Sequence, residues 1–207
     1  MLTVEADPIG VEKKLTSGEI NCPGCGSVLR PWGWAAMRVL RGEGPSRLRL
    51  RPRRSHCSTC RATHVLLPVI ALLRRADAAV VIGTALLAKA RGAGHRAIAA
   101  ALGRPAETVR GWLRSFARRA EEIRVLFTVL LTGVDPDPRI PAAAGGDALG
   151  DAVAAMLALA EAVRRRWPAL GAASPWQVAV AATHGRLIFP AGSRSSINTS
   201  RLWEQLM

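Results

Sequence analysis

Four cysteines arranged in two pairs are the residues of this sequence whose type and spacing could do chemistry. They form the motifs Cys22-Pro-Gly-Cys25 and Cys57-Ser-Thr-Cys60, and the chain has no other cysteine. Each Cys-x2-Cys motif can bend the backbone so that two sulfurs face one ion, and two motifs complete a tetrahedral Zn²⁺ site. Gly24 and Gly26 supply a permissive backbone for the first bend. We predict one structural zinc per chain; disulfides or scattered core cysteines are the alternatives.

His64 follows the second motif by four residues. Because four thiolates already fill a closed zinc site, we expect His64 to take a strand or DNA-facing position instead of binding metal. The cysteines are expected to be metal ligands and not reactive thiols, and we expect no catalytic constellation around the four histidines. The sequence therefore predicts a protein that is not an enzyme and has no small-molecule substrate.

The charge of the chain is concentrated around the cysteines. Net charge is +14, and residues 21–75 carry eleven basic side chains against one acidic side chain. Such a concentration favours a polyanion partner, because basic groups on nucleic acid release condensed counterions. Arginine outnumbers lysine 26 to 3, which a high-GC genome also explains, so the location of the charge is the stronger argument. With no secretory signal or membrane-length apolar run, we expect a cytoplasmic, nucleoid-associated protein with no membrane partner.

The cysteine motifs flank segments with the alternation of β-strands. Arg47 to Arg51 alternates Arg and Leu, which predicts a strand with Leu48 and Leu50 inward and Arg47, Arg49 and Arg51 outward on phosphate. Thr63 to Leu67 predicts a second strand. We expect residues 1–70 to form a small zinc ribbon that includes a leader strand or arm over residues 1–20, and we expect Arg53 and Arg54 to add phosphate contacts. Trp32 and Trp34 could stack on unpaired bases, but packing within the ribbon is the preferred interpretation.

The segment from His95 to Arg114 has the spacing of a helix-turn-helix. Ala99 is the small residue between the helices, Gly103 makes the turn, and Val109 and Trp112 hold the second helix. An ordinary three-helix bundle is the alternative. The side chains expected to face outward and contact the major groove are Arg104, Ala106, Glu107, Thr108, Arg110 and Arg114. Among them, arginines can reach guanine or phosphate, and Glu107 can accept from cytosine.

The predicted fold class is mainly α: the small β zinc ribbon, a helix-turn-helix bundle over residues 76–133, and C-terminal helices over 147–207. Residues 134–146, rich in Pro and Gly, predict a linker. Asp77, Asp147 and Ser174 are expected to cap helices. Heptad spacing predicts that the second helix of the pair extends into a long packing helix. That helix can pair with the helix after Asp147 within the chain or across a homodimer.

The order of zinc ribbon and helix-turn-helix resembles the DNA-binding front end of insertion-sequence transposases. It is most similar to a family of small uncharacterised actinobacterial proteins often found beside mobile elements. The motifs that carry the resemblance are the two cysteine motifs, Thr63-His-Val-Leu-Leu-Pro68, Thr108-Val-Arg-Gly-Trp-Leu113, Phe116-Ala-Arg-Arg119 and Ile197-Asn-Thr199. The resemblance implies a DNA-binding part and nothing about an activity of the C-terminal part.

The sequence as a whole predicts a zinc-dependent protein that binds double-stranded DNA and regulates or assists a mobile element. A truncated transposase front end that binds element ends, and an RNA-binding zinc-ribbon protein, are the alternatives. A transposase core would need three carboxylates for two Mg²⁺ ions. The acidic residues after the linker are Asp147, Asp151, Glu161 and Glu204, and no run of strands accompanies them, so no catalytic core is expected.

Overall fold

A computed structural model describes residues 1–143, 147–170 and 173–189. Its strands all lie in the first third of the chain. They are β1 Leu2–Val4, β2 Leu29–Trp34, β3 Arg38–Arg41, β4 Arg47–Leu50, β5 Arg53–Cys57 and β6 Thr63–Pro68. The helices are α1 Pro8–Ser17, α2 Ala79–Ala90, α3 His95–Leu102, α4 Ala106–Ala117, α5 Ala120–Val134, α6 Ala148–Arg166, η1 Pro168–Leu170 and α7 Pro175–Ala182.

The prediction of a mainly α fold with a small ribbon is wrong. The chain is 47% helix and 18% strand, and it combines a mixed four-stranded sheet, a two-stranded sheet and seven α-helices within the described residues. The four-stranded sheet has the order β1-β6-β5-β2, in which β1 is parallel to β6 and the other pairs are antiparallel. The fold is therefore an α/β mixture.

Of the leader strand or arm expected over residues 1–20, the structure shows a strand, because β1 joins this sheet and helix α1 packs against it. Strand β1 adds to the sheet edge, with Leu2 opposite Leu66. Asp7 then accepts hydrogen bonds from the N–H groups of Ile9 and Gly10 and so caps α1, as expected for an Asp at an N-cap. Helix α1 buries Val11 and Leu15 against one face of the sheet, in a cluster that includes two of the cysteines.

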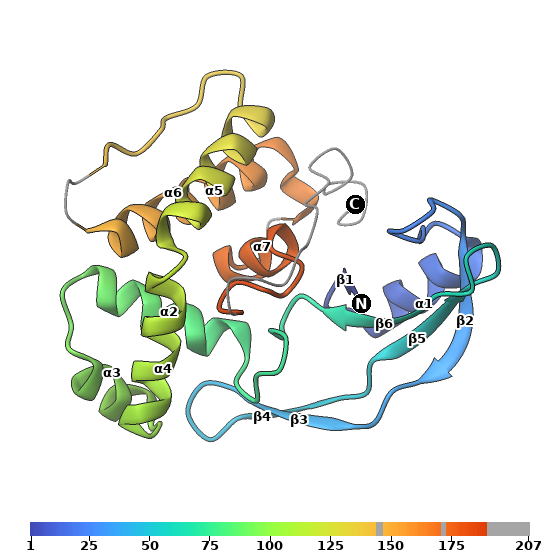
Figure 1. Ribbon diagram of the computed structural model, residues 1–207, viewed down its shortest axis with the longest axis horizontal. Coiled ribbons are helices and arrows are strands. Elements are labelled where there is room, and N and C mark those ends of the chain that lie inside the picture. Colours follow the sequence, from blue (N-terminus) through green and yellow to red (C-terminus); the bar gives the residue numbers. More distant parts are fainter. Residues whose placement is uncertain (144–146, 171–172, 190–207) are drawn as a thin grey trace.

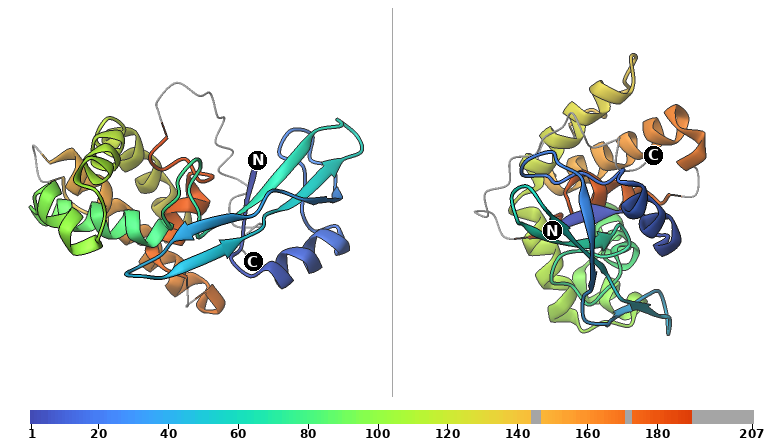
Figure 2. Two further views of the ribbon diagram at one scale, coloured as in Figure 1. Left: turned by 90° about the horizontal axis from the view of Figure 1, so that it is seen from below. Right: turned by 90° about the vertical axis from the view of Figure 1, so that its right-hand side faces the viewer.

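A long hairpin connects the sheet to the helices. Strands β2 and β5 pair near the cysteines, and β3 and β4 continue the same two chain segments outward to a turn at Gly42–Ser46. The hairpin runs along one side of the molecule, and its tip reaches the end where α3 and α4 lie (Figure 1). The views from below and from the side show the same extended ribbon (Figure 2).

Helices α2 to α7 share one hydrophobic core. It includes Ile82 and Leu86 of α2, Phe127 of α5, Met156 of α6 and Val180 of α7, all fully buried. Helix α6 packs beside α5 within the chain (Figure 1). The intramolecular pairing predicted for the two heptad runs is confirmed, whereas the homodimer stays a prediction.

The expected long helix is interrupted. Helix α4 ends at Ala117, and α5 begins at Ala120 after a turn at Arg118 and Arg119. The Arg119 guanidinium donates to the backbone carbonyls of Arg186 and Phe189 and pairs with Glu122. These tertiary contacts accompany the break, which heptad spacing alone could not indicate.

Two of the three predicted caps are confirmed. Asp147 caps α6, and Ser174 forms a capping box with Gln177 at α7. Asp77 caps nothing: the N-cap of α2 is Ala78, without a side-chain cap. The resemblance motif at 197–199 and the expected irregular end lie outside the described residues. In the described ranges no helix has the length and apolar character needed to cross a membrane.

Candidate metal centre and basic surface

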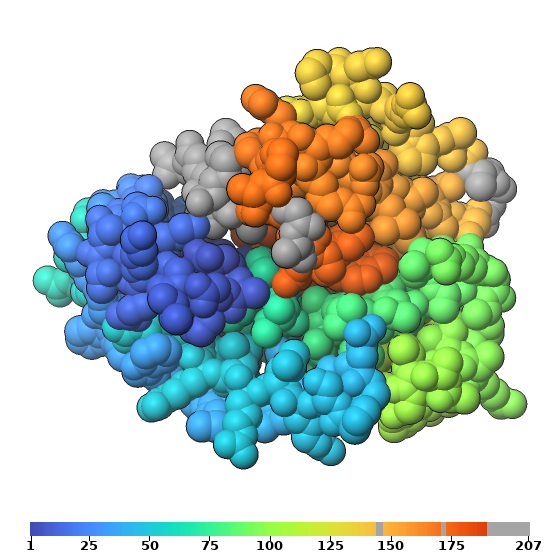
Figure 3. All heavy atoms as spheres, turned by 180° about the vertical axis from the view of Figure 1, so that it is seen from behind, coloured from blue at the N-terminus to red at the C-terminus, as the bar shows by residue number. Residues whose placement is uncertain are grey.

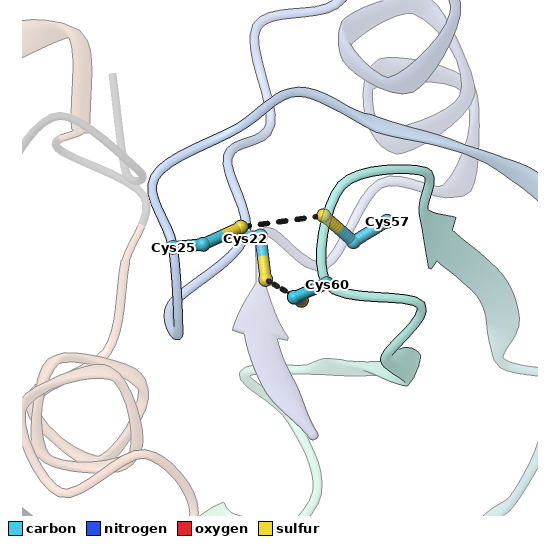
Figure 4. Close-up of side chains that lie close together, drawn as sticks. All are labelled: Cys22, Cys25, Cys57 and Cys60. Atoms are coloured by element: carbon cyan, nitrogen blue, oxygen red, sulfur yellow. Dashed lines mark hydrogen bonds between the residues drawn. The ribbon is translucent and has the colours of Figure 1, made fainter.

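The two cysteine motifs form matching turns. In the first, Cys22 N–H donates to Ser27 O, and Gly26 has a φ of +76° directly after the second cysteine. In the second, Cys57 N–H donates to Ala62 O, and Arg61 takes the equivalent left-handed conformation with a φ of +60°. Each turn directs two sulfurs toward the other turn (Figure 4).

The four sulfurs lie close enough for one metal ion. Cys22 Sγ is 3.6 Å from Cys60 Sγ, Cys25 Sγ is 3.4 Å from Cys57 Sγ, and all four lie within 4.8 Å of one another. A tetrahedral Zn²⁺ with Zn–S bonds of about 2.3 Å places its sulfurs about 3.8 Å apart. The cysteines are free thiols, not disulfides. The arrangement therefore suits one metal ion, and four thiolates fit zinc.

Burial of the ligands is unequal. Cys22 and Cys57 are buried in the cluster that also contains Leu15 and Leu29, whereas Cys25 and Cys60 are exposed. The exposed pair lies at the rim of the turns, where a metal could enter. Because the inner pair belongs to the core between α1 and the sheet, binding a metal there is coupled to folding of the N-terminal part.

The pKa values of two of the four cysteines are shifted in opposite directions. Hydrogen bonds from the backbone and then the side chain of Ser27 lower the pKa of Cys25 to about 6. The Ala62 backbone N–H also lowers the pKa of Cys60, but the Cys57 and Cys22 thiols outweigh it and raise that pKa to about 12. Because a metal binds thiolates, loading an ion at these four cysteines would release protons to solvent.

His64 lies against the metal centre and not on a DNA-facing surface. It is in strand β6, as predicted, but is only 9% exposed, and its Nε2 is 3.5 Å from Cys22 Sγ. Burial, followed by the positive charge of the N-terminus, lowers the pKa of His64. A neutral imidazole can donate its Nε2–H to a Cys22 thiolate, and such a contact orients and stabilises a metal ligand.

The outer side of α4 carries most of the predicted contact residues. Glu107, Arg110 and Arg114 are exposed and Thr108 is half-buried, whereas Ala106 is half-buried and packs against the hydrophobic core. Gly111 lies among them with open space around it. Arg110 Nη1 is 3.4 Å from Glu107, and both side chains are at least half exposed, so this pair is weak. On the inner side Val109, Trp112 and Phe116 are buried. Helix α4 thus has an exposed face with Glu107, Arg110 and Arg114 and a buried face, but the outward position predicted for Ala106 is wrong.

The prediction that Arg104 faces outward is wrong. Its side chain is 7% exposed and pairs with Asp77 at 2.6 Å, while its Nη2 donates to Gly42 O at 2.7 Å. Asp77, 3% exposed, also accepts from Arg41 at 2.6 Å. Arg104 thus joins the turn between α3 and α4 to the hairpin tip through a buried carboxylate. Arginine spacing could not reveal this, because Asp77 is far from both partners in sequence.

The hairpin arginines are only partly placed as predicted. Arg47 and Arg49 are exposed and lie opposite Arg41 and Val39 across the β3–β4 pair. Leu50 packs toward a small cluster around Leu40 and Leu67, whereas Leu48 is 38% exposed instead of buried. The hairpin and the α3–α4 pair meet on one side of the molecule (Figure 3).

Arg51 and Arg53, also predicted to contact phosphate, differ in whether their guanidinium groups are free to do so. Arg51 is exposed, and its guanidinium lies 5.8 Å from the ring of Trp34. Arg53 pairs with Glu12 of α1 and donates to Gly33 O, so it is a structural residue and not a free phosphate contact. The preferred packing of the tryptophans is also wrong: Trp32 is 58% exposed and Trp34 46%.

Comparison of the chain with protein-family models, curated proteins and solved structures found no match.

Proposed function

We propose that this chain is a zinc-containing protein that binds double-stranded DNA, with α3 and α4 acting as a helix-turn-helix. The observation that carries the proposal is the shared location of two basic elements. The hairpin with Arg47 and Arg49 is fixed by Asp77 and Arg104 to the turn that precedes α4. A duplex contacting α4 in its major groove would thus have cations available for its backbone.

In this proposal α4 supplies sequence readout. Arg110 and Arg114 are one turn apart on its outer side, next to Gly111, which lets a groove approach closely. Their guanidinium groups can donate in pairs to guanine O6 and N7. Glu107 holds Arg110 only weakly and can accept from a cytosine amino group. The hairpin arginines supply affinity without sequence preference.

The metal supports binding indirectly. It would hold together the turn after which β2 starts and the turn at which β5 ends, and both strands connect to the hairpin. Its function is structural, because four protein ligands leave no open position for a substrate. We therefore propose that this chain acts as a binding protein and not as an enzyme.

We further propose that DNA binding by this chain regulates or assists a mobile element. The support for this role is the resemblance of its sequence motifs to the DNA-binding front end of insertion-sequence transposases. A transposase front end without catalysis would bind the same kind of duplex. The two roles differ in where the bound sites lie, at element ends or at a promoter, so selection of preferred duplexes separates them.

The experiment is selection of bound sequences from random duplexes, followed by affinity measurements on the selected site. Arg110→Ala is expected to lower affinity for that site by ~1–3 kcal/mol and to relax preference at one base pair. Arg139→Ala, an exposed arginine in the segment after α5, is the charge-matched control and should leave the base preference unchanged. An Arg110→Ala protein with unaltered sequence preference would contradict readout by α4.

A further inference from the structure

At its β2–β5 end the four-stranded sheet has one face that no helix covers within the described residues, whereas Leu67 on the same face is buried under the hairpin. Cross-strand partners share a face, so Arg30, His56 and Thr63 form one row, and Arg54 and Val65 form the next. These five residues are exposed or half-buried. The opposite face carries Leu29, Cys57 and Leu66, which pack against α1. We call the uncovered surface the outer face.

An indole lies open on this outer face. Trp32 is 58% exposed, and its ring centroid is 5.1 Å from that of His56 at an interplanar angle of 34°. The histidine supports one part of the indole and leaves the remainder accessible. Trp34 is different, because Arg51 and Arg53 lie over its ring at 5.8 and 4.7 Å. Trp32 is therefore the ring that can accept a partner.

The side chains around Trp32 are basic, which favours an anionic binding partner. Arg30 and Arg54 share its face, and the only acidic residue in the whole of residues 21–75 is Glu43, at the distant hairpin turn. A flat face with an open ring and surrounding cations suits a strand of nucleic acid whose bases are unpaired. Bases within a duplex are already stacked on one another and cannot lie on an indole.

The hairpin places this face in line with α4. It leads from the β2–β5 pair to the turn beside α3 and α4 (Figure 1), and Arg47, Arg49 and Arg51 are exposed along one of its segments. A strand that leaves the end of a bound duplex would meet these cations before it reaches Trp32. The two surfaces can thus hold one continuous DNA molecule.

We propose that the outer face binds single-stranded DNA extending from the duplex, with Trp32 stacked on a base and Arg30 and Arg54 on the phosphates. This inference rests on the proposed duplex binding and adds a second kind of DNA, unpaired, to it. Base–aromatic stacking contributes enough that removing the ring should weaken binding about tenfold.

The test compares a blunt duplex with the same duplex carrying single-stranded thymidine extensions of increasing length. The zinc-loaded full chain should bind the extended form more tightly than the blunt form, once the extension reaches the sheet. Trp32→Ala should remove this gain, about tenfold, without changing the affinity for the blunt duplex. Trp32→Phe should keep most of the gain but lose the quenching of tryptophan fluorescence that the extension causes in the unaltered protein.

Ile9→Ala is the control, since Ile9 is a 77% exposed apolar residue on α1, away from the outer face. An extension that adds no affinity, a gain that survives Trp32→Ala, or an equal loss in Ile9→Ala would each overturn the inference. So would tighter binding of RNA extensions than of DNA extensions. Failure to bind even the blunt duplex would instead contradict the proposed function, so the two failures are distinguishable.

Discussion

At the scale of single residues, the candidate metal centre has His64 as a neighbour beside its four cysteines. His64 is buried, and burial lowers the pKa of its imidazole, which lies 3.5 Å from Cys22 Sγ. Its Nδ1 has no hydrogen-bond partner among the described residues. Burying a polar imidazole costs free energy because the ring loses its hydrogen bonds to water. The contact between His64 Nε2 and Cys22 Sγ offsets part of that cost.

His64→Ala should lower zinc affinity by about 10- to 100-fold, as expected for loss of a group that orients a ligand. Competition with a chromophoric chelator measures this. His56→Ala is the matched control, since His56 neighbours Cys57 in sequence but belongs to the outer face, and it should bind zinc normally. Equal affinities in both variants would contradict the role given to His64.

The cysteines could be predicted from sequence, whereas His64 could not. Cys-x2-Cys is a local pattern, and its turn geometry follows from neighbouring residues. His64 contacts Cys22 across 42 positions, through strand pairing that no short motif encodes. The same limit applies to Arg104, which directly precedes α4 and was expected to face outward, because its partner Asp77 lies before α2.

At the scale of elements, the group of Arg41, Asp77 and Arg104 holds the hairpin tip against the α3–α4 turn. Backbone hydrogen bonds strengthen this junction: Arg41 N–H donates to Ala76 O, and Ala78 N–H donates to Arg41 O. The three chain segments thus meet around one buried carboxylate. Removing that carboxylate would leave Arg104, 7% exposed, without its charge partner.

Asp77→Ala should lower the free energy of unfolding by about 3 kcal/mol, because it leaves a buried cation unpaired. Urea denaturation of the zinc-loaded protein measures the change. Asp135→Ala removes the partner of Arg165, which is 54% exposed, and should cost less than ~1 kcal/mol. Similar small losses in the two variants would show that the Asp77 junction does not hold the elements together.

Helix α2 depends on a glycine where it meets α7. A Cβ at Gly83 would lie 2.0 Å from the Trp176 ring, closer than any real contact. Gly83→Ala should therefore destabilise the protein by ~1–3 kcal/mol through overpacking. Gly111→Ala, with no atom within 4 Å of the new methyl, should instead stabilise by about 0.5–1 kcal/mol. Thermal unfolding compares them, and a gain in both would contradict this packing of α2 on α7.

At the scale of the whole molecule, the sheet, hairpin and helices form a connected α/β structure. The helical half was predictable, because amphipathic spacing and caps such as Asp147 and Ser174 are local. The sheet was underestimated: β1 is three residues long and pairs in parallel with β6, more than sixty positions later in the chain. The bulged β2, with Gly33 at a φ of +97°, likewise lacks the alternation of an ordinary strand.

The whole molecule is proposed to hold duplex DNA with α4 and the hairpin together, and the salt dependence of duplex binding tests this most directly. The zinc-loaded protein should bind duplex DNA in preference to single-stranded RNA of equal length, with affinity falling steeply as salt rises. Arg47→Ala and Arg49→Ala should each reduce the slope of log affinity against log salt by about 0.9. Absence of duplex binding by the zinc-loaded protein, or a slope that neither variant changes, would contradict the account.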